Sequence, residues 1–300
     1  MAEEEDIYAS LRKEFDRKYN DTIIPLVHDY EGSRKKRLYL AIISSAATAI
    51  LGVSLWSFSP DLSGLLIASS AAIWIYIQKS FENKIKEKIM PTACSCFVDM
   101  KWQEGSYTDS SIFTSSYLIS NYSYDDYDDI FYGSYHDVKF EIIESKFTTH
   151  SGKHSITIFD GVIVKLEMNK HFTSHTVIKP DMFLNIPPSF KLHHTELEDP
   201  EFNKKFDVYT NDEVEARYLI TPSFMERLKN METAFMARTA TCVFYNNFLM
   251  IALPTGSDLF SLCSLFKPVD DPKQFFRMYD EIESIIKLID YFKLNQKIGL

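Results

Sequence analysis

The stretch that decides the fold is residues 38–58, which read LYLAIISSAATAILGVSLWSF without a charged side chain. As an α-helix this stretch would be about 30 Å long, which matches the thickness of the hydrocarbon core of a bilayer. A helix of that length inside a globular protein usually keeps a polar stripe. We therefore predict that residues 38–58 form a transmembrane helix.

A second uncharged stretch follows the short turn Ser59-Pro60-Asp61 and covers residues 62–78. It is shorter than the first, but Gln78 and the following lysine can extend to the interface when the two helices pair. Aromatic residues lie near the ends of both stretches, as expected for interfacial belts: they include Trp56, Trp74 and Tyr76. The sequence therefore predicts a transmembrane hairpin over residues 38–79.

Basic residues flank this hairpin on its open side only. Arg34, Lys35, Lys36 and Arg37 precede the first stretch, and Lys79, Lys84, Lys86 and Lys88 follow the second, whereas the turn has neither Lys nor Arg. Because basic residues favour the cytoplasmic side, we expect both termini in the cytoplasm. The acidic N-terminus is unlike a signal peptide. These patterns predict a multi-pass protein whose first partner is the lipid bilayer.

Small residues recur at a spacing of four in both stretches. They are Ser44, Thr48 and Gly52 in the first, and Gly64, Ala68 and Ala72 in the second. Small side chains at this spacing let helices approach closely in lipid. The pattern predicts helix packing, either within the hairpin or between two copies of the chain.

Composition narrows the other possibilities. The chain has 300 residues and a formal net charge of −10, which disfavours nucleic acid as a partner. Its four cysteines, Cys94, Cys96, Cys242 and Cys263, match neither a zinc-ribbon spacing nor a disulfide scaffold. We expect buried thiols in a reducing compartment, and no cofactor or metal.

The remaining segments predict one amphipathic helix and one soluble domain. Residues 1–37 contain an amphipathic pattern that Pro25 interrupts, and residues 80–92 continue the second helix until Pro91 ends it. Residues 93–300 change to alternating patterns typical of strands, with turns predicted at Asp160-Gly161 and Asn246-Asn247.

Two helices complete the predicted domain. Thr221 and Pro222 are typical of a helix N-terminus, and residues 271–294 place apolar side chains on one helical face. The fold class that follows is α+β: an amphipathic helix, a transmembrane hairpin, and an antiparallel sheet with packed helices and a long C-terminal helix.

Candidate chemistry in this domain is sparse. Asp125, Asp126, Asp128 and Asp129 indicate either a divalent-cation site or a solvated acidic loop, and their spacing favours the loop. Two histidine pairs, His150/His154 and His171/His175, have the i, i+4 spacing of zinc ligands on a helix, but their flanks predict strands and turns. We expect Asp212 and Arg217 to form a buried ion pair, with a ligand role as the alternative.

Three segments resemble a known family. They are residues 170–181 (KHFTSHTVIKPD), 197–209 (LEDPEFNKKFDVY) and 215–228 (EARYLITPSFMERL), and the segments around Glu14–Pro25 and Arg34–Lys36 add to the likeness. In this order they are similar to the DUF3137 family of bacterial membrane proteins. The resemblance implies a bacterial membrane protein with a cytoplasmic domain, located in the inner membrane. It implies no activity.

Three functional hypotheses follow. In the first, the chain is a membrane-anchored scaffold or sensor that binds a protein or a lipid headgroup. In the second, it is an enzyme that acts on a membrane-proximal substrate. In the third, it is a hairpin subunit that forms homo-oligomers. Because no catalytic motif occurs in the sequence, the first is favoured.

Overall fold

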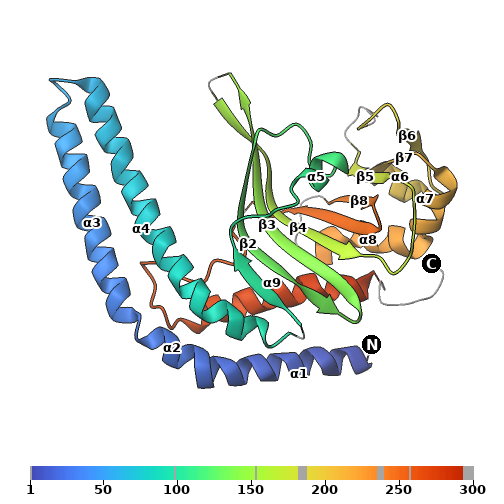
Figure 1. Ribbon diagram of the computed structural model, residues 1–300, viewed down its shortest axis with the longest axis horizontal. Helices are drawn as coiled ribbons and strands as arrows, with labels where there is room; N and C mark the ends of the chain where they lie inside the picture. The colour runs from blue at the N-terminus through green and yellow to red at the C-terminus, as the bar shows by residue number, and fades with distance from the viewer. Residues whose placement is uncertain are drawn as a thin grey trace. The chain divides into compact units, whose positions relative to one another are not determined.

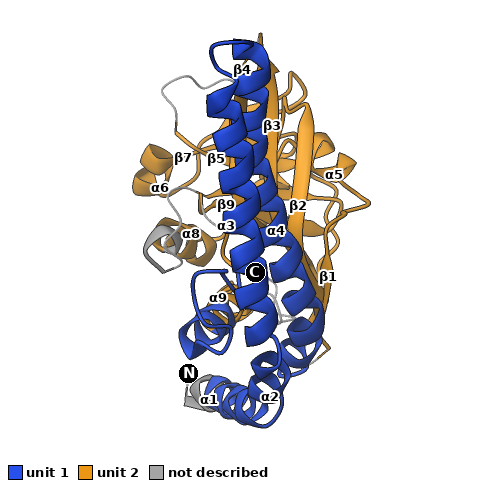
Figure 2. Cartoon of the chain, turned by 90° about the vertical axis from the view of Figure 1, so that its left-hand side faces the viewer, with its two compact units in different colours: residues 1–97, 261–279 blue, residues 98–260, 280–300 orange. Residues whose placement is uncertain are grey.

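The computed structural model describes residues 2–97, 99–152, 154–181, 188–234, 240–256 and 258–292. The chain divides into two compact units (Figure 2): Met1–Phe97 with Ser261–Tyr279, and Val98–Phe260 with Asp280–Leu300. Residues 261–279 group with the N-terminal helices in unit 1, although they lie far along the chain from those helices.

Unit 1 begins with α1 (Ala2–Lys18), the π-helical turn η1 (Tyr19–Ile23) and α2 (Ile24–His28). A proline has no N–H and crowds the carbonyl four residues before it, and the wider π-turn upstream of Pro25 accommodates this. The chain therefore stays helical from α1 through η1 to α2, and Pro25 changes only the local helix type. Phe15 and Tyr19 are buried, and the Phe15 ring lies 4.5 Å from that of Tyr279 in α9 (Pro272–Tyr291).

The two long apolar helices are α3 (Glu31–Ser54) and α4 (Pro60–Cys94), which run side by side in Figure 1. Pro60 occupies the first turn of α4, where its missing N–H costs nothing. The prediction that Pro91 ends this helix is wrong. Pro91 lies inside α4, whose last turns are held by the buried side chains of Met90 and Ala93.

Side-chain hydrogen bonds join α3 to α4 along their length. Ser63 Oγ donates to the Gly52 carbonyl at 2.5 Å, and Ser45 Oγ donates to the Ser70 carbonyl at 3.0 Å. These pairs lie in opposite order along the two helices. The result is an antiparallel helical hairpin.

Unit 2 is built on a nine-stranded sheet within the described residues, with all strand pairs antiparallel and the order β1-β2-β3-β4-β9-β8-β5-β7-β6. The strands are β1 (Lys101–Glu104), β2 (Tyr124–Tyr135), β3 (Val138–Ser151), β4 (His154–Glu167), β5 (Thr176–Pro180), β6 (His193–Thr195), β7 (Phe206–Thr210), β8 (Thr241–Tyr245) and β9 (Phe248–Pro254). The predicted α+β class is confirmed.

Helices cover both faces of this sheet. One face carries a core that includes Ile143, Ile163 and Val243, with α5 (Ser111–Ser115) packed on it. The second half of α9 lies along the other face (Figure 1), and the ring of its neighbour Phe292 packs 4.9 Å from Phe224. The short helices α6 (Pro200–Lys205), α7 (Glu213–Leu219) and α8 (Pro222–Ala234) connect the strands at one end. Residues 293–294 of the predicted closing helix lie outside the described residues.

The predicted turns have different outcomes. Asn246 and Asn247 both have positive φ, 50° and 64°, and form the two-residue turn between β8 and β9, as predicted. The turn predicted at Asp160-Gly161 is wrong, because both residues lie inside β4 and the chain turns at Gly152 instead. Thr221 is confirmed as the cap of α8, where its Oγ1 accepts the Phe224 N–H at 3.2 Å.

Candidate functional site

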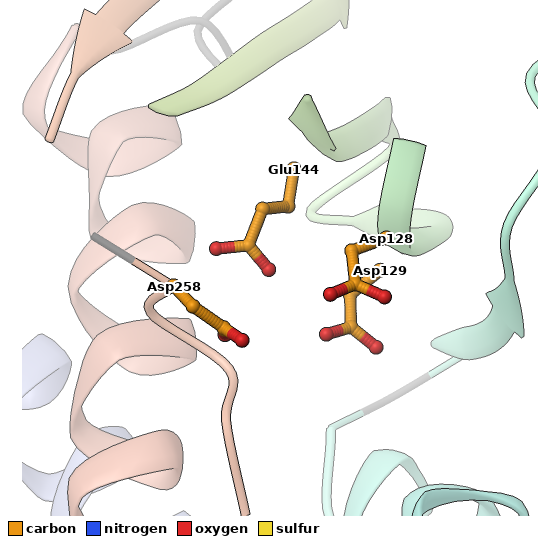
Figure 3. A group of neighbouring side chains, drawn as sticks. All are labelled: Asp128, Asp129, Glu144 and Asp258. Atoms are coloured by element: carbon orange, nitrogen blue, oxygen red, sulfur yellow. The ribbon is translucent and has the colours of Figure 1, made fainter. Parts of the chain in front are cut away.

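Four carboxylates from distant parts of the chain meet in unit 2. Asp128, Asp129, Glu144 and Asp258 each offer one oxygen, and these oxygens all lie within 4.8 Å of one another (Figure 3). A β-bulge explains two of them: the register between β2 and β3 shifts between Tyr127 and Ile130, so that Asp128 and Asp129 together face Glu144.

The chain supplies some of the donors that this carboxylate cluster needs. Trp102 Nε1 donates to Asp129 Oδ1 at 2.7 Å, and the Leu259 N–H donates to Glu144 Oε1 at 2.7 Å. Asp129 and Glu144 are buried, and Asp258 is exposed. Oxygen ligands in this arrangement suit a hard divalent cation such as Ca²⁺ or Mg²⁺.

The solvated acidic loop predicted around these aspartates is wrong. All four aspartates of that run lie in β2, and Asp129 is fully buried. Aspartate has a low strand propensity, so local sequence predicts a loop for these four aspartates. Tertiary pairing with β3 overrides that local preference.

A groove of about 550 Å³ opens on the sheet surface. Its volume lies in the range of small-ligand sites. Strand register explains its lining, because Tyr132, Glu141 and Lys165 are direct neighbours across β2, β3 and β4. The remaining lining residues include Lys101, Ser134, Lys139, Glu167 and Phe248. The groove therefore combines aromatic rings with alternating charges.

Lys165 is the most enclosed charge in this groove. Its ammonium lies 3.3 Å from Glu141 Oε1, donates to the Tyr107 hydroxyl at 3.2 Å, and lies 4.5 Å from the centre of the Phe248 ring. Tyr107 in turn donates to Glu141 Oε2 at 2.6 Å. Burial, together with this hydrogen bond to a carboxylate, raises the pKa of Tyr107 above its usual value. The phenol therefore remains a hydrogen-bond donor throughout the physiological pH range.

The residues predicted at the membrane interface fall into two groups. The first group is exposed: Lys35, Lys36, Lys79, Tyr76, and Trp56 in the turn after α3, which has 59% of its surface exposed. Arg34 is buried instead, where it pairs with Glu31 at 2.6 Å and donates to the Leu265 carbonyl. Arg37 is half-buried and donates to Ser80 Oγ at 3.3 Å.

Residues 261–269 form a segment, here called the strap, that polar side chains of α3 and α4 hold. Glu82 Oε1 accepts from Ser261 Oγ at 2.7 Å and from the Leu262 N–H at 3.0 Å. Gln78 donates to the Cys263 carbonyl at 3.0 Å and accepts the Leu265 N–H at 2.9 Å. The strap was not anticipated from the sequence, since nothing local in residues 261–269 indicates a helical partner.

The two small-residue stripes occupy different surfaces. Gly52 is buried against α4, where an added Cβ would lie 2.9 Å from Ile67 Cγ1, and Ser44 and Thr48 are half-buried beside it. Gly64, Ala68 and Ala72 are exposed, and a Cβ added at Gly64 would meet nothing within 4 Å. Ser63, one residue earlier, is buried and donates to the Gly52 carbonyl.

The ion pair predicted between Asp212 and Arg217 is not formed. Asp212 is exposed and caps α7, where it accepts the N–H groups of Val214 and Glu215. Arg217 pairs with Glu198 at 2.8 Å and lies 3.8 Å from Glu213. Asp212 accepts two backbone N–H groups at the start of α7, and the ion-pair prediction does not consider this capping role.

The two histidine pairs do not lie on helices. His175 Nε2 lies 2.8 Å from the Ser116 carbonyl, and His171 Nδ1 lies 3.2 Å from Asn247 Nδ2. His150 and His154 lie in neighbouring strands β3 and β4, so the helical spacing of zinc ligands does not arise. The four cysteines are buried free thiols, and burial raises the pKa of Cys96 to about 11.

Comparison with protein families identifies part of the chain. The model of a family described as "Protein of unknown function (DUF3137)" matches residues 157–294. Over residues 157–294 the chain is similar to the DUF3137 family. The resemblance predicted from the sequence is confirmed over this region, which contains the three segments at 170–181, 197–209 and 215–228. The N-terminal segments of the resemblance lie outside the match.

In the DUF3137 region the resembling segments stabilise one end of the sheet. Glu215 accepts the N–H groups of Thr173 and Ser174 at 3.0 and 2.6 Å, which ties the start of β5 to α7. Asp199 caps α6 and pairs with Lys229 at 2.5 Å. These contacts give the segments a structural role.

A comparison with curated proteins found no match. Among solved structures, the crystal structure of the mycobacterial trehalose monomycolate transport factor A, TtfA, matches at 9% identity with a TM-score of 0.37. The match covers 67% of this chain and 91% of that chain.

Proposed function

We propose that this protein is a membrane-anchored binding protein, in which α3 and α4 cross a bilayer and unit 2 binds a protein segment or a lipid headgroup at the cytoplasmic surface. One observation supports the membrane anchor most directly. The apolar windows of α3 and α4 are only 11% and 6% buried. The core helix of a soluble protein is mostly buried, whereas an apolar surface left open on this scale requires another partner, and lipid supplies it.

The distribution of charge supports an orientation with both termini in the cytoplasm. Lys35, Lys36, Lys79, Lys84 and Lys88 are exposed near the open end of the hairpin, and residues 55–59 contain no basic residue. Two of the basic residues counted from sequence, Arg34 and Lys86, are buried, but the asymmetry persists without them. A bacterial inner membrane fits this orientation and the family resemblance.

The groove beside Lys165 is the binding site that unit 2 offers. Lys165 is paired with Glu141, and Lys139 with Glu167 at 3.0 Å, so the charges of the groove alternate in sign. A ligand that complements such a surface must carry both positive and negative charges, or must contact only the lysines or only the glutamates. Protein segments and zwitterionic headgroups both meet this requirement.

Crosslinking in native membranes tests the binding role. A photoreactive amino acid replaces Lys139 in the groove, and a matched variant carries it at Ser155, which is exposed in β4 outside the groove lining. We expect a discrete protein or lipid adduct from position 139 that position 155 does not give. Identical adduct patterns from the two positions would refute a binding role for the groove.

A second candidate role is that of an oligomerising hairpin. The stripe Gly64, Ala68 and Ala72 lies exposed on α4, where it is available to a second copy of the chain. Replacing Ala68 with leucine should then shift the protein toward the monomer in mild detergent. A wild-type protein that is monomeric under these conditions would contradict this role.

A further inference from the structure

The strap carries an exposed aromatic residue at its turn. The Phe266 N–H donates to Ser264 Oγ at 3.3 Å, and the Lys267 N–H donates to the Ser264 carbonyl at 3.2 Å. Leu265, the preceding residue, is fully buried, whereas 69% of the Phe266 surface is exposed. The turn therefore presents one large apolar side chain outward from a segment that is otherwise fixed.

Phe266 lies against the apolar part of α4. Its ring stacks on Trp74 with a centroid separation of 5.1 Å and an interplanar angle of 26°. Trp74 lies four residues before Gln78. It is therefore about 6 Å, or one helical turn, deeper in the apolar stretch than Gln78. The Phe266 ring thus extends the apolar surface of the hairpin instead of joining the core of unit 1.

Polar residues on both sides of this point fix its position along the helices. Gln78 holds the strap at Cys263 and Leu265, and Glu82 holds it one turn further from the apolar stretch. Lys79 follows Gln78 in the chain, Lys267 follows Phe266, and both lysines are exposed. Basic side chains at this level would be attracted by anionic headgroups. An aromatic ring next to basic residues is the composition of an interfacial anchor.

We propose that Phe266 inserts into the bilayer beside Trp74, at the boundary between headgroups and acyl chains, so that the strap is a third membrane-contacting element. This inference rests on the proposed membrane anchor. It goes beyond the anchor because the contact comes from a distant segment of the chain, whose Leu265 lies 187 residues after Gln78 of α4. The strap then couples the DUF3137 region of the chain directly to the membrane surface.

Depth-dependent fluorescence quenching tests this inference in the full-length protein. Three variants each carry one tryptophan, with the other native tryptophans replaced by phenylalanine: native Trp74 alone, Phe266→Trp, and Phe190→Trp. Phe190 is the matched control, because it is 87% exposed but belongs to unit 2. Each variant is reconstituted in phosphatidylcholine–phosphatidylglycerol vesicles that contain lipid brominated near the top of the acyl chain.

We expect the tryptophan at 266 to be quenched by brominated lipid as strongly as Trp74 and to be protected from aqueous iodide. The tryptophan at 190 should show the opposite behaviour. Quenching at 74 together with iodide access and no lipid quenching at 266 would overturn the insertion of the strap and leave the anchor intact. No lipid quenching at 74 would overturn the anchor itself, and the inference with it.

Discussion

Gly161 offers a sharp test of the packing between β4 and β9. A Cβ added at this position would lie 2.2 Å from the Leu253 carbonyl oxygen and 2.7 Å from the Thr255 nitrogen, far inside the 3.4 Å at which ordinary contact begins. Both neighbours are backbone atoms, so no side chain can rotate away. Gly161→Ala must therefore move one strand relative to the other.

The expected cost follows from two opposing terms. Overpacking of a well-ordered region costs about 1–3 kcal/mol, and a clash with backbone belongs at the upper end. Alanine restricts the unfolded chain more than glycine does, which returns about 0.4–1 kcal/mol. We expect a net loss of about 2 kcal/mol from the free energy of unfolding of unit 2.

Trp102 in β1 reports on this unit once Trp56 and Trp74 are replaced by phenylalanine. Urea unfolding of the full chain in mild detergent, followed by Trp102 fluorescence, compares Gly161→Ala with Gly32→Ala. Gly32 lies in α3 and has nothing within 4 Å of an added Cβ, so its substitution should be neutral or stabilising. A Gly161→Ala protein as stable as the parent would refute the close approach of β4 and β9.

Three further predictions follow from other contacts. Gly52→Leu should weaken the α3–α4 hairpin by about 1–3 kcal/mol in unfolding by sodium dodecyl sulfate, because Gly52 is buried against Ile67, whereas Gly64→Leu should leave it unchanged; equal effects would contradict the assigned helix faces. Tyr107→Phe should lower the stability of unit 2 by about 1–3 kcal/mol in urea, because it removes the hydroxyl between Glu141 and Lys165; an unchanged midpoint would argue against this network. Burial lowers the pKa of His175 from its ordinary value of 6.5, so the unfolded chain takes up the proton first and stability should fall as pH drops below 6.5. His175→Gln should flatten this pH dependence in urea titrations, and an unaltered profile would exclude His175 as its source.

The features that sequence predicts well are those with strong local signals. The apolar stretches, the helix cap Thr221, the turn Asn246-Asn247 and the apolar face of α9 each depend on the chemistry of a few neighbouring residues. These signals were sufficient for the α+β class and for the paired apolar helices.

The features that sequence does not predict depend on contacts between distant residues. Gly161 reads as a turn residue, yet its lack of a Cβ serves the approach of β9. The aspartates of β2 read as a loop, yet a bulge against Glu144 places two of them in the carboxylate cluster. The strap depends on Gln78 and Glu82, which are nearly two hundred residues away in the chain.

Cysteine accessibility in intact cells tests the central claim, that the hairpin spans the membrane with unit 2 on the cytoplasmic side. Ser59→Cys places a thiol in the turn, and Ser155→Cys places one on an exposed position of β4. The unmodified chain is the background control, because its four native thiols are buried.

We expect a membrane-impermeant maleimide to label position 59 in intact cells and to label position 155 only after permeabilisation. Labelling of position 155 in intact cells, or of position 59 only after permeabilisation, would contradict it.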